Sequence, residues 1–158
     1  MDAGAIRPGY ELWRPNREKP ESKSARALVV FLLLVSAGIA AVITIGGWER
    51  LEGGKIFAVL YVVLYLLFAF FVARWNRGVL PVAAALAIIL AIFAGIAAPN
   101  WFDRAKDGLS SPLLPEELLG LLTLLLVPIQ VILIAVAMVA FNQNWHVEEE
   151  RPIGDEID

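Results

Sequence analysis

The stretch PVAAALAIILAIFAG, residues 81–95, contains no charged, hydroxyl or amide side chain. Every fourth position in it is small, at Ala83, Ala87, Ala91 and Gly95. Within a lipid bilayer, apolar side chains gain little by touching one another, so helices associate through small residues that let their backbones approach closely. The stretch therefore predicts a membrane-spanning helix that packs on another helix through this ridge.

The whole chain has the composition of a membrane protein. Of its 158 residues, 59% are apolar and only 18% are charged, and the mean hydropathy is +0.70. A helix needs about 20 apolar residues to cross the hydrocarbon core, and four stretches approach or exceed that length. The sequence predicts transmembrane helices over about residues 27–48, 56–75, 79–101 and 115–143.

Two other interpretations of these stretches are disfavoured. A large soluble helical protein would need more polar residues between the stretches to cover its surface. The first stretch does not fit a cleaved secretory signal. The charged segment of 26 residues before it and its apolar core are both longer than those of a signal peptide. We expect the first stretch to remain as a transmembrane helix.

Short connections between the stretches predict that consecutive helices are neighbours. Residues 48–55 and 74–78 form the first two connections, and the third runs from Pro99 to about Pro112. Connections of this length join adjacent helices in bundles. We therefore expect an all-α integral membrane protein, with four helices in an up-down-up-down bundle over residues 27–145.

The distribution of Lys and Arg predicts the orientation. Nine of these residues lie in the two tails and the second connection, and four lie in the first and third connections. Positive residues concentrate on the cytoplasmic side of a membrane. Both termini are therefore expected in the cytoplasm, with the chain in the plasma membrane of a bacterium.

A tryptophan lies at or just beyond the end of each of the four expected spans. Indole rings favour the membrane–water boundary, so these tryptophans are expected to act as interface anchors: Trp48, Trp75, Trp101 and Trp145.

Span one carries the row Ser36, Ala40 and Thr44, which is expected to contact the ridge of residues 83–95. The aromatic residues of span two are expected to face lipid or a larger partner: Phe57, Tyr61, Tyr65, Phe68, Phe70 and Phe71.

The spans offer few groups that could do chemistry. The chain has no Cys and a single His, and the stretches 27–48, 56–73, 78–102 and 118–145 contain no Asp, Glu, Lys, Arg or His. The best polar candidates are Gln130, two residues after Pro128, and Thr123. They could contact a lipid headgroup or a quinone, or satisfy the backbone carbonyl that the proline frees. We expect no enzymatic activity and no cofactor held by this chain alone, and we expect bound lipids.

The two tails suggest a protein partner. Residues 1–26 contain several prolines and are expected to be extended, with Tyr10, Trp13 and Arg14 available for docking. Residues 146–158 form an acidic tail, which could pair with basic residues of the first tail or of another subunit.

The layout of four short-looped spans with cytoplasmic tails is similar to that of small accessory subunits of bacterial respiratory complexes. This resemblance concerns architecture alone and implies a non-catalytic accessory subunit that binds other integral membrane subunits and lipids, not nucleic acid. The alternative is a small transporter or channel formed by several copies of this chain.

Overall fold

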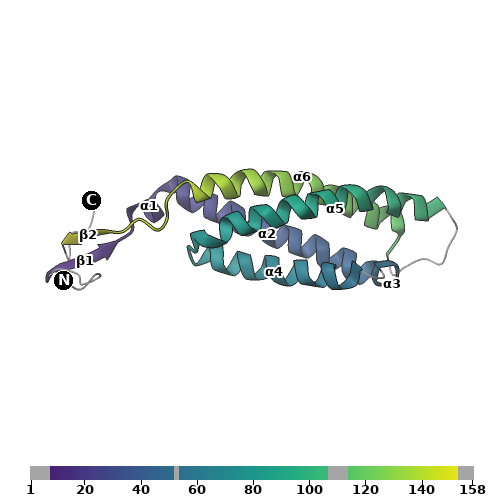
Figure 1. Ribbon diagram of the computed structural model, residues 1–158, viewed down its shortest axis with the longest axis horizontal. Helices are drawn as coiled ribbons and strands as arrows, with labels where there is room; N and C mark the ends of the chain where they lie inside the picture. Colours follow the sequence, from purple (N-terminus) through teal and green to yellow (C-terminus); the bar gives the residue numbers. More distant parts are fainter. Residues whose placement is uncertain (1–7, 52–53, 107–113, 153–158) are drawn as a thin grey trace.

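Four long helices make up most of the protein (Figure 1). The computed structural model describes residues 8–51, 54–106 and 114–152. All four helices are long and apolar enough to cross a membrane, which confirms the prediction of a helical chain with four spans. They are α2 (Pro20–Gly46), α4 (Lys55–Ala73), α5 (Leu80–Lys106) and α6 (Glu116–Phe141).

Short elements flank the long helices within the described residues. Two strands lie near the chain ends, single helical turns precede and follow α2, and a 3-10 turn precedes α5. Their bounds are β1 (Tyr10–Trp13), α1 (Pro15–Glu18), α3 (Trp48–Leu51), η2 (Arg77–Val79) and β2 (Glu149–Pro152).

Helix α2 begins earlier than the sequence predicted. Its first residue is Pro20, so residues 20–26 are helical where an extended tail was expected. Proline suits the first turn of a helix because its missing N–H would have no partner there, and Glu21 then lies near the positive end of the helix dipole. The prediction was wrong because it placed the helix start where ionisable residues stop. A membrane helix can continue into the headgroup region, where water solvates such residues.

Helix α5 also extends beyond its predicted end. It continues through Pro99 to Lys106, where a connection was expected from Pro99 onward. The proline removes one backbone hydrogen bond, to the carbonyl of Gly95, and this single loss does not end the helix. The remainder of the expected connection, residues 107–113, lies outside the described residues.

The long helices form a ring of neighbours. The most extensive contacts join α5 to α6, α2 to α4 and α2 to α6, and α4 meets α5 over a smaller area (Figure 1). Helices α2 and α5 are not among these pairs. The expected close contact between the row Ser36, Ala40 and Thr44 and the ridge of residues 83–95 is therefore wrong: the two helices lie across the core from each other, and Ala40 and Thr44 border a cavity there.

The small-residue ridge of α5 is buried for only part of its length. Ala83 and Ala87 are fully buried, Ala91 is half-buried and Gly95 is exposed. Residues four apart on a helix advance by about 400°, so a strict four-residue row turns about 40° per step away from a straight contact line. Alternating steps of three and four stay on that line. Apart from Ala83, which is buried beside Ala84, the buried residues of α5 follow this alternation: Leu80, Ala84, Ala87, Ala94, Ala98 and Trp101.

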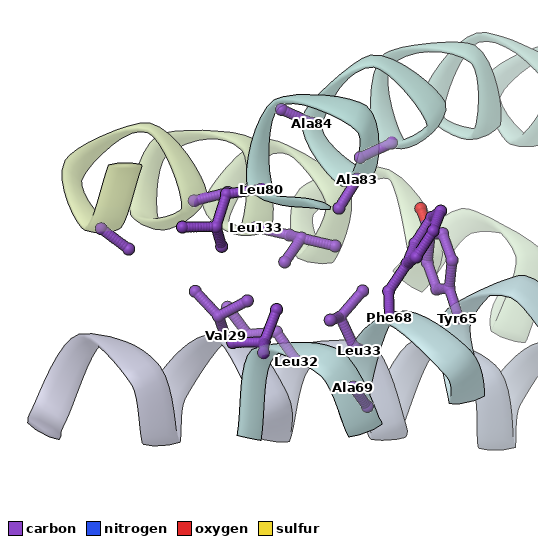
Figure 2. Packing of buried hydrophobic residues seen from close by; sticks show 14 of the residues in the cluster. Val29, Leu32, Leu33, Tyr65, Phe68, Ala69, Leu80, Ala83, Ala84 and Leu133 are labelled. Atoms are coloured by element: carbon purple, nitrogen blue, oxygen red, sulfur yellow. The ribbon is translucent and has the colours of Figure 1, made fainter. Parts of the chain in front are cut away.

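Side chains from all four long helices form the main hydrophobic core (Figure 2). Val29 and Leu33 of α2, Tyr65 of α4, Leu80 of α5 and Leu133 of α6 are each at most 1% exposed. A second cluster lies toward α3, since Leu51 packs against it. Its members are Ile43, Ala94, Trp101, Leu119 and Leu126.

The aromatic residues of α4 divide between two faces. Tyr61, Tyr65 and Phe68 are buried in the bundle, so the expectation that they face lipid or a partner was wrong. These three residues follow one another at steps of four and three, which keeps them on the inward side of the helix. The outward side carries Phe57, Phe70 and Phe71.

The two tails meet in a two-stranded antiparallel ribbon beyond one end of the bundle (Figure 1). Arg14 forms an ion pair with Glu148 at 2.6 Å, and Arg151 forms one with Glu11 at 2.9 Å. The acidic tail thus pairs with the first tail, which is one of the two arrangements that its charge left open. Each tail orders the other.

Candidate functional site

A buried cluster of polar side chains links three of the long helices. The Tyr65 hydroxyl of α4 donates a hydrogen bond to Gln130 Oε1 of α6 over 2.7 Å. Gln130 Nε2 donates to Ser36 Oγ of α2 over 2.9 Å, and the Ser36 hydroxyl donates to the Leu32 carbonyl over 2.7 Å. An unbonded polar group in hydrocarbon is costly, so these bonds favour the arrangement in which the three helices meet.

The two polar candidates of span four, Gln130 and Thr123, have different surroundings. Gln130 bonds to Tyr65 and Ser36, and Thr123 donates to the carbonyl of Leu119 over 2.7 Å. The carbonyl that loses its donor to Pro128 belongs to Leu124, and neither candidate takes that role. Gln130 is fully buried, whereas Thr123 lines a cavity described below.

Sequence reasoning missed the tyrosine in this cluster. Tyr65 had been grouped with lipid-facing aromatic residues, although a tyrosine buried in a membrane helix needs a partner for its hydroxyl. The available signal was its spacing from Tyr61 and Phe68, which places all three on one face. Tyr61 likewise donates to the Leu86 carbonyl of α5 over 2.9 Å.

A tryptophan ends α4 in an unusual conformation. The N–H of Trp75 bonds to the Val72 carbonyl and the N–H of Asn76 bonds to the Phe71 carbonyl, both over 2.9 Å. This is the Schellman pattern, in which the residue at the Trp75 position takes a left-handed conformation and is usually glycine. Trp75 has a φ of 65°, which costs a non-glycine residue about 1–2 kcal/mol. Contacts of its ring must offset that cost.

Those contacts come from Trp145 and two arginines. The Trp75 and Trp145 rings meet edge to face with centroids 5.1 Å apart. The guanidinium of Arg26 lies 4.2 Å from the Trp75 ring centre, and that of Arg17 lies 5.7 Å from it. Cation–π contacts of this kind contribute about 0.5–2 kcal/mol each. The ring of Trp75 is therefore held between α2, the segment that follows α6, and the N-terminal tail.

The four tryptophans differ in their surroundings. Trp48 is 44% exposed and Trp75 is half-buried, but Trp101 and Trp145 are at most 5% exposed. An indole enclosed by protein cannot lie among lipid headgroups, so the expectation of four interface anchors is wrong for Trp101 and Trp145. The error arose because position at a span exit fixes depth in the membrane but not whether a ring faces lipid or protein.

Arginines bond to backbone carbonyls at the ends of two helices near the ribbon. Arg26 donates to Ala73 O at the end of α4 over 2.9 Å, and Arg77 donates to Phe141 O at the end of α6 over 2.7 Å. Arg17 donates to the carbonyl of Trp145 over 3.0 Å. Positive side chains at these positions also complement the negative ends of the helix dipoles. Burial lowers the pKa of Arg17, the charge of Arg14 lowers it further, and Glu148 opposes both.

The three expected docking residues all lie in or beside the ribbon. Tyr10 and Trp13 are the two ends of β1, and Arg14 follows directly. The Trp13 ring lies 5.2 Å from the guanidinium of Arg151, and Arg14 bonds to Glu148. Trp13 and Arg14 thus contact residues of the ribbon itself or residues next to it. Neither edge of the ribbon pairs with another strand among the described residues.

A cavity of about 350 Å³ lies between the helices toward α3. Its walls come from all four long helices and are almost entirely apolar, with Ala40 and Thr44 of the predicted packing row among them. A sealed and empty cavity of this volume would cost up to roughly 8 kcal/mol, at about 24 cal/mol per Å³. The cavity is partly open to the surface of the bundle, so surrounding molecules can fill it.

The helices define the class of this protein, which is a multi-pass membrane protein with four spans. Among residues 8–51, 54–106 and 114–152, no three His, Cys, Asp or Glu side chains gather as a metal site would require. Comparisons with protein-family models, with curated proteins and with solved structures find no match.

Proposed function

We propose that this chain is a non-catalytic accessory subunit of a larger bacterial membrane complex, of the respiratory or another energy-transducing kind. In this proposal the four helices form an up-down-up-down bundle in the plasma membrane, and both termini lie in the cytoplasm. Other integral membrane subunits contact the outer faces of the helices, and the ribbon contacts a partner at the cytoplasmic surface.

The ribbon is the observation that carries this proposal. It extends beyond the bundle and offers two strand edges, each a row of backbone groups able to pair with a further strand (Figure 1). Leu12 is 43% exposed on it, beside the charged pairs of Arg14 and Arg151. A two-stranded ribbon is only marginally stable alone, so a partner that adds a strand would stabilise it.

The membrane-embedded part agrees with a structural role. Its central polar side chains, Ser36, Tyr65 and Gln130, bond to one another and so hold the bundle together. The outward face of α4 is continuous and bulky, which suits contact with lipid or with another helix. The large apolar residues exposed on it are Ile56, Phe57, Val59, Leu60, Val63, Leu66, Leu67, Phe70 and Phe71.

Two deletions test the proposal with a matched control. Removal of residues 2–13 eliminates β1 but keeps Arg17 and Arg26, which bond to the carbonyls of Trp145 and Ala73, whereas removal of residues 2–9 keeps β1. After mild detergent extraction, native mass spectrometry should show several-fold less of the foreign subunits with the longer deletion and no loss with the shorter one. Membrane insertion should be equal for both.

The outcomes separate the alternatives. If both deletions retain the same subunits in the same amounts, the ribbon is not the docking element. If the intact chain is extracted alone, the accessory role is wrong. Extraction as several identical copies that conduct a substrate in liposomes would establish the homo-oligomeric transporter or channel instead.

A further inference from the structure

We propose that the cavity between α4 and α5 is a binding site for one acyl chain of a membrane phospholipid, held inside the bundle and distinct from the lipid that coats its surface. The site is a property of this chain alone and does not depend on the accessory role. It rests on the position of the opening, the chemistry of the walls and the depth of the cavity.

The opening faces the bilayer. Helices α4 and α5 contact each other over a small area, and the rings of Phe57 and Phe93 meet across the gap with centroids 5.9 Å apart. Both rings line the cavity and are also more than half exposed, at 57% and 51%. Because both belong to membrane-length helices, the surface on which they are exposed is covered by lipid. The two rings touch, so a chain enters sideways beside them, past Ile96, which also lines the cavity and is 62% exposed.

The walls select a hydrocarbon occupant. Three hydroxyl groups line the cavity, and each already donates its proton to a backbone carbonyl. Thr44 donates to Ala40 O over 2.6 Å, Thr123 donates to Leu119 O over 2.7 Å, and Tyr61 donates to Leu86 O over 2.9 Å. A polar ring placed among them would leave its own oxygens unbonded, which is costly in an apolar site. An acyl chain has no polar group to leave unbonded there, and its contacts with the walls replace the missing packing.

The depth of the cavity matches one leaflet. Along α5 it extends from Leu90 to Trp101, a separation of eleven positions, or about 16 Å of helix rise. Half of a hydrocarbon core of about 30 Å is about 15 Å. At its outer end the lining includes Gly54, which directly precedes α4, and Asn100 and Trp101, where the apolar part of α5 ends before Asp103 and a headgroup would begin. The chain would thus point its methyl end toward Tyr61 and Leu90, near the centre of the bundle.

Photochemical crosslinking of the full-length chain tests this site. The purified protein is reconstituted with a phosphatidylglycerol that carries a diazirine near the end of one acyl chain, then irradiated and mapped by peptide mass spectrometry. The expected crosslinks fall on the inner walls, at Thr123 and Leu126 of α6, which are each 4% exposed and out of reach of surface lipid.

Two variants of α5 provide the matched comparison. Ala97→Phe places a ring in the cavity, whereas Ala85→Phe places the same ring on an exposed position outside it. Crosslinks at Thr123 and Leu126 should fall at least fivefold in Ala97→Phe and stay unchanged in Ala85→Phe. If Ala97→Phe does not fold, the crosslink map of the unaltered chain decides by itself.

Three results would overturn the assignment. The first is crosslinking confined to outward residues such as Ile88 and Val131, which is what surface lipid alone produces. The second is equal labelling of the inner walls in a folded Ala97→Phe protein. The third is labelling of these walls by a diazirine-bearing isoprenoid quinone in preference to the phospholipid, which would assign the cavity to a prenyl chain.

Discussion

Gln130 of α6 donates a hydrogen bond from its side-chain amide to Ser36 Oγ of α2 over 2.9 Å, in the interior of the bundle. Gln130 also accepts a bond from Tyr65 of α4, so one side chain ties three helices together. In hydrocarbon, no water replaces a bond that is lost. Thr123, by contrast, bonds only within its own helix, to Leu119.

Replacement of this glutamine should weaken the bundle. Gln130→Leu removes two interhelical hydrogen bonds and leaves the Tyr65 hydroxyl in an apolar site, which should lower the free energy of unfolding by about 1–3 kcal/mol. Reversible unfolding in mixed detergent and SDS micelles measures the change. Thr123→Val is the control and should change stability by less than about 0.5 kcal/mol. Equal effects of the two substitutions would show that the cluster does not hold the helices together.

The contact line of α5 can be tested by adding bulk at two positions of the sequence-predicted ridge. Ala87 is fully buried, whereas Gly95 is exposed and has no atom within 4 Å of where a Cβ would lie. Ala87→Leu should destabilise the bundle by about 1–3 kcal/mol through overpacking, and Gly95→Leu should be tolerated. SDS unfolding midpoints provide the measurement. If Gly95→Leu lowers the stability more than Ala87→Leu does, the predicted ridge of residues 83–95 is the packing surface after all.

The tryptophans at the span exits should differ in their effect on stability. Trp145 is fully buried and packs edge-on against Trp75, so Trp145→Ala should lower the free energy of unfolding by about 3 kcal/mol or more. Trp48 is largely exposed, with the Lys55 ammonium 4.8 Å from its ring centre, and Trp48→Ala should cost about 1 kcal/mol or less. Comparable losses from both substitutions, measured by unfolding, would contradict the enclosed position of Trp145.

The proposed orientation can be measured because the chain has no Cys. Gly54→Cys places a thiol at an exposed position near α3, and Glu149→Cys places one on the exposed ribbon at the other end of the bundle. With both termini cytoplasmic, a membrane-impermeant maleimide should label Gly54→Cys in spheroplasts and label Glu149→Cys only after lysis. The reverse pattern would show that the positive-inside count was misleading for this chain.

The sequence predicted the four spans because their existence depends on local composition. A segment such as residues 81–95 has no polar side chain, and in a bilayer a helix is the conformation that satisfies its backbone. The predicted ends were less accurate at Pro20 and Pro99. Charged residues indicate where the chain reaches water, but a helix can continue into that region. A proline removes one backbone hydrogen bond, and that loss alone does not end a helix.

The candidate site could be predicted only in part. Gln130 and Thr123 stood out because polar residues are rare in the spans, but their partners did not. The sequence shows no direct sign that Tyr65 would meet Gln130, because the two residues are separated by 65 positions and belong to different helices. The cavity likewise depends on the gap between α4 and α5, which no single segment encodes.

Composition by itself therefore determined that this chain spans a membrane four times, since transfer of each apolar segment into hydrocarbon depends on that segment alone. The tertiary structure decided which faces meet: Ala87 inward and Gly95 outward on one helix, Trp145 enclosed and Trp48 exposed. The physical reason is that lipid and protein interiors are nearly equally apolar. Hydrophobicity cannot distinguish them, and the fit between side chains of different helices makes the choice.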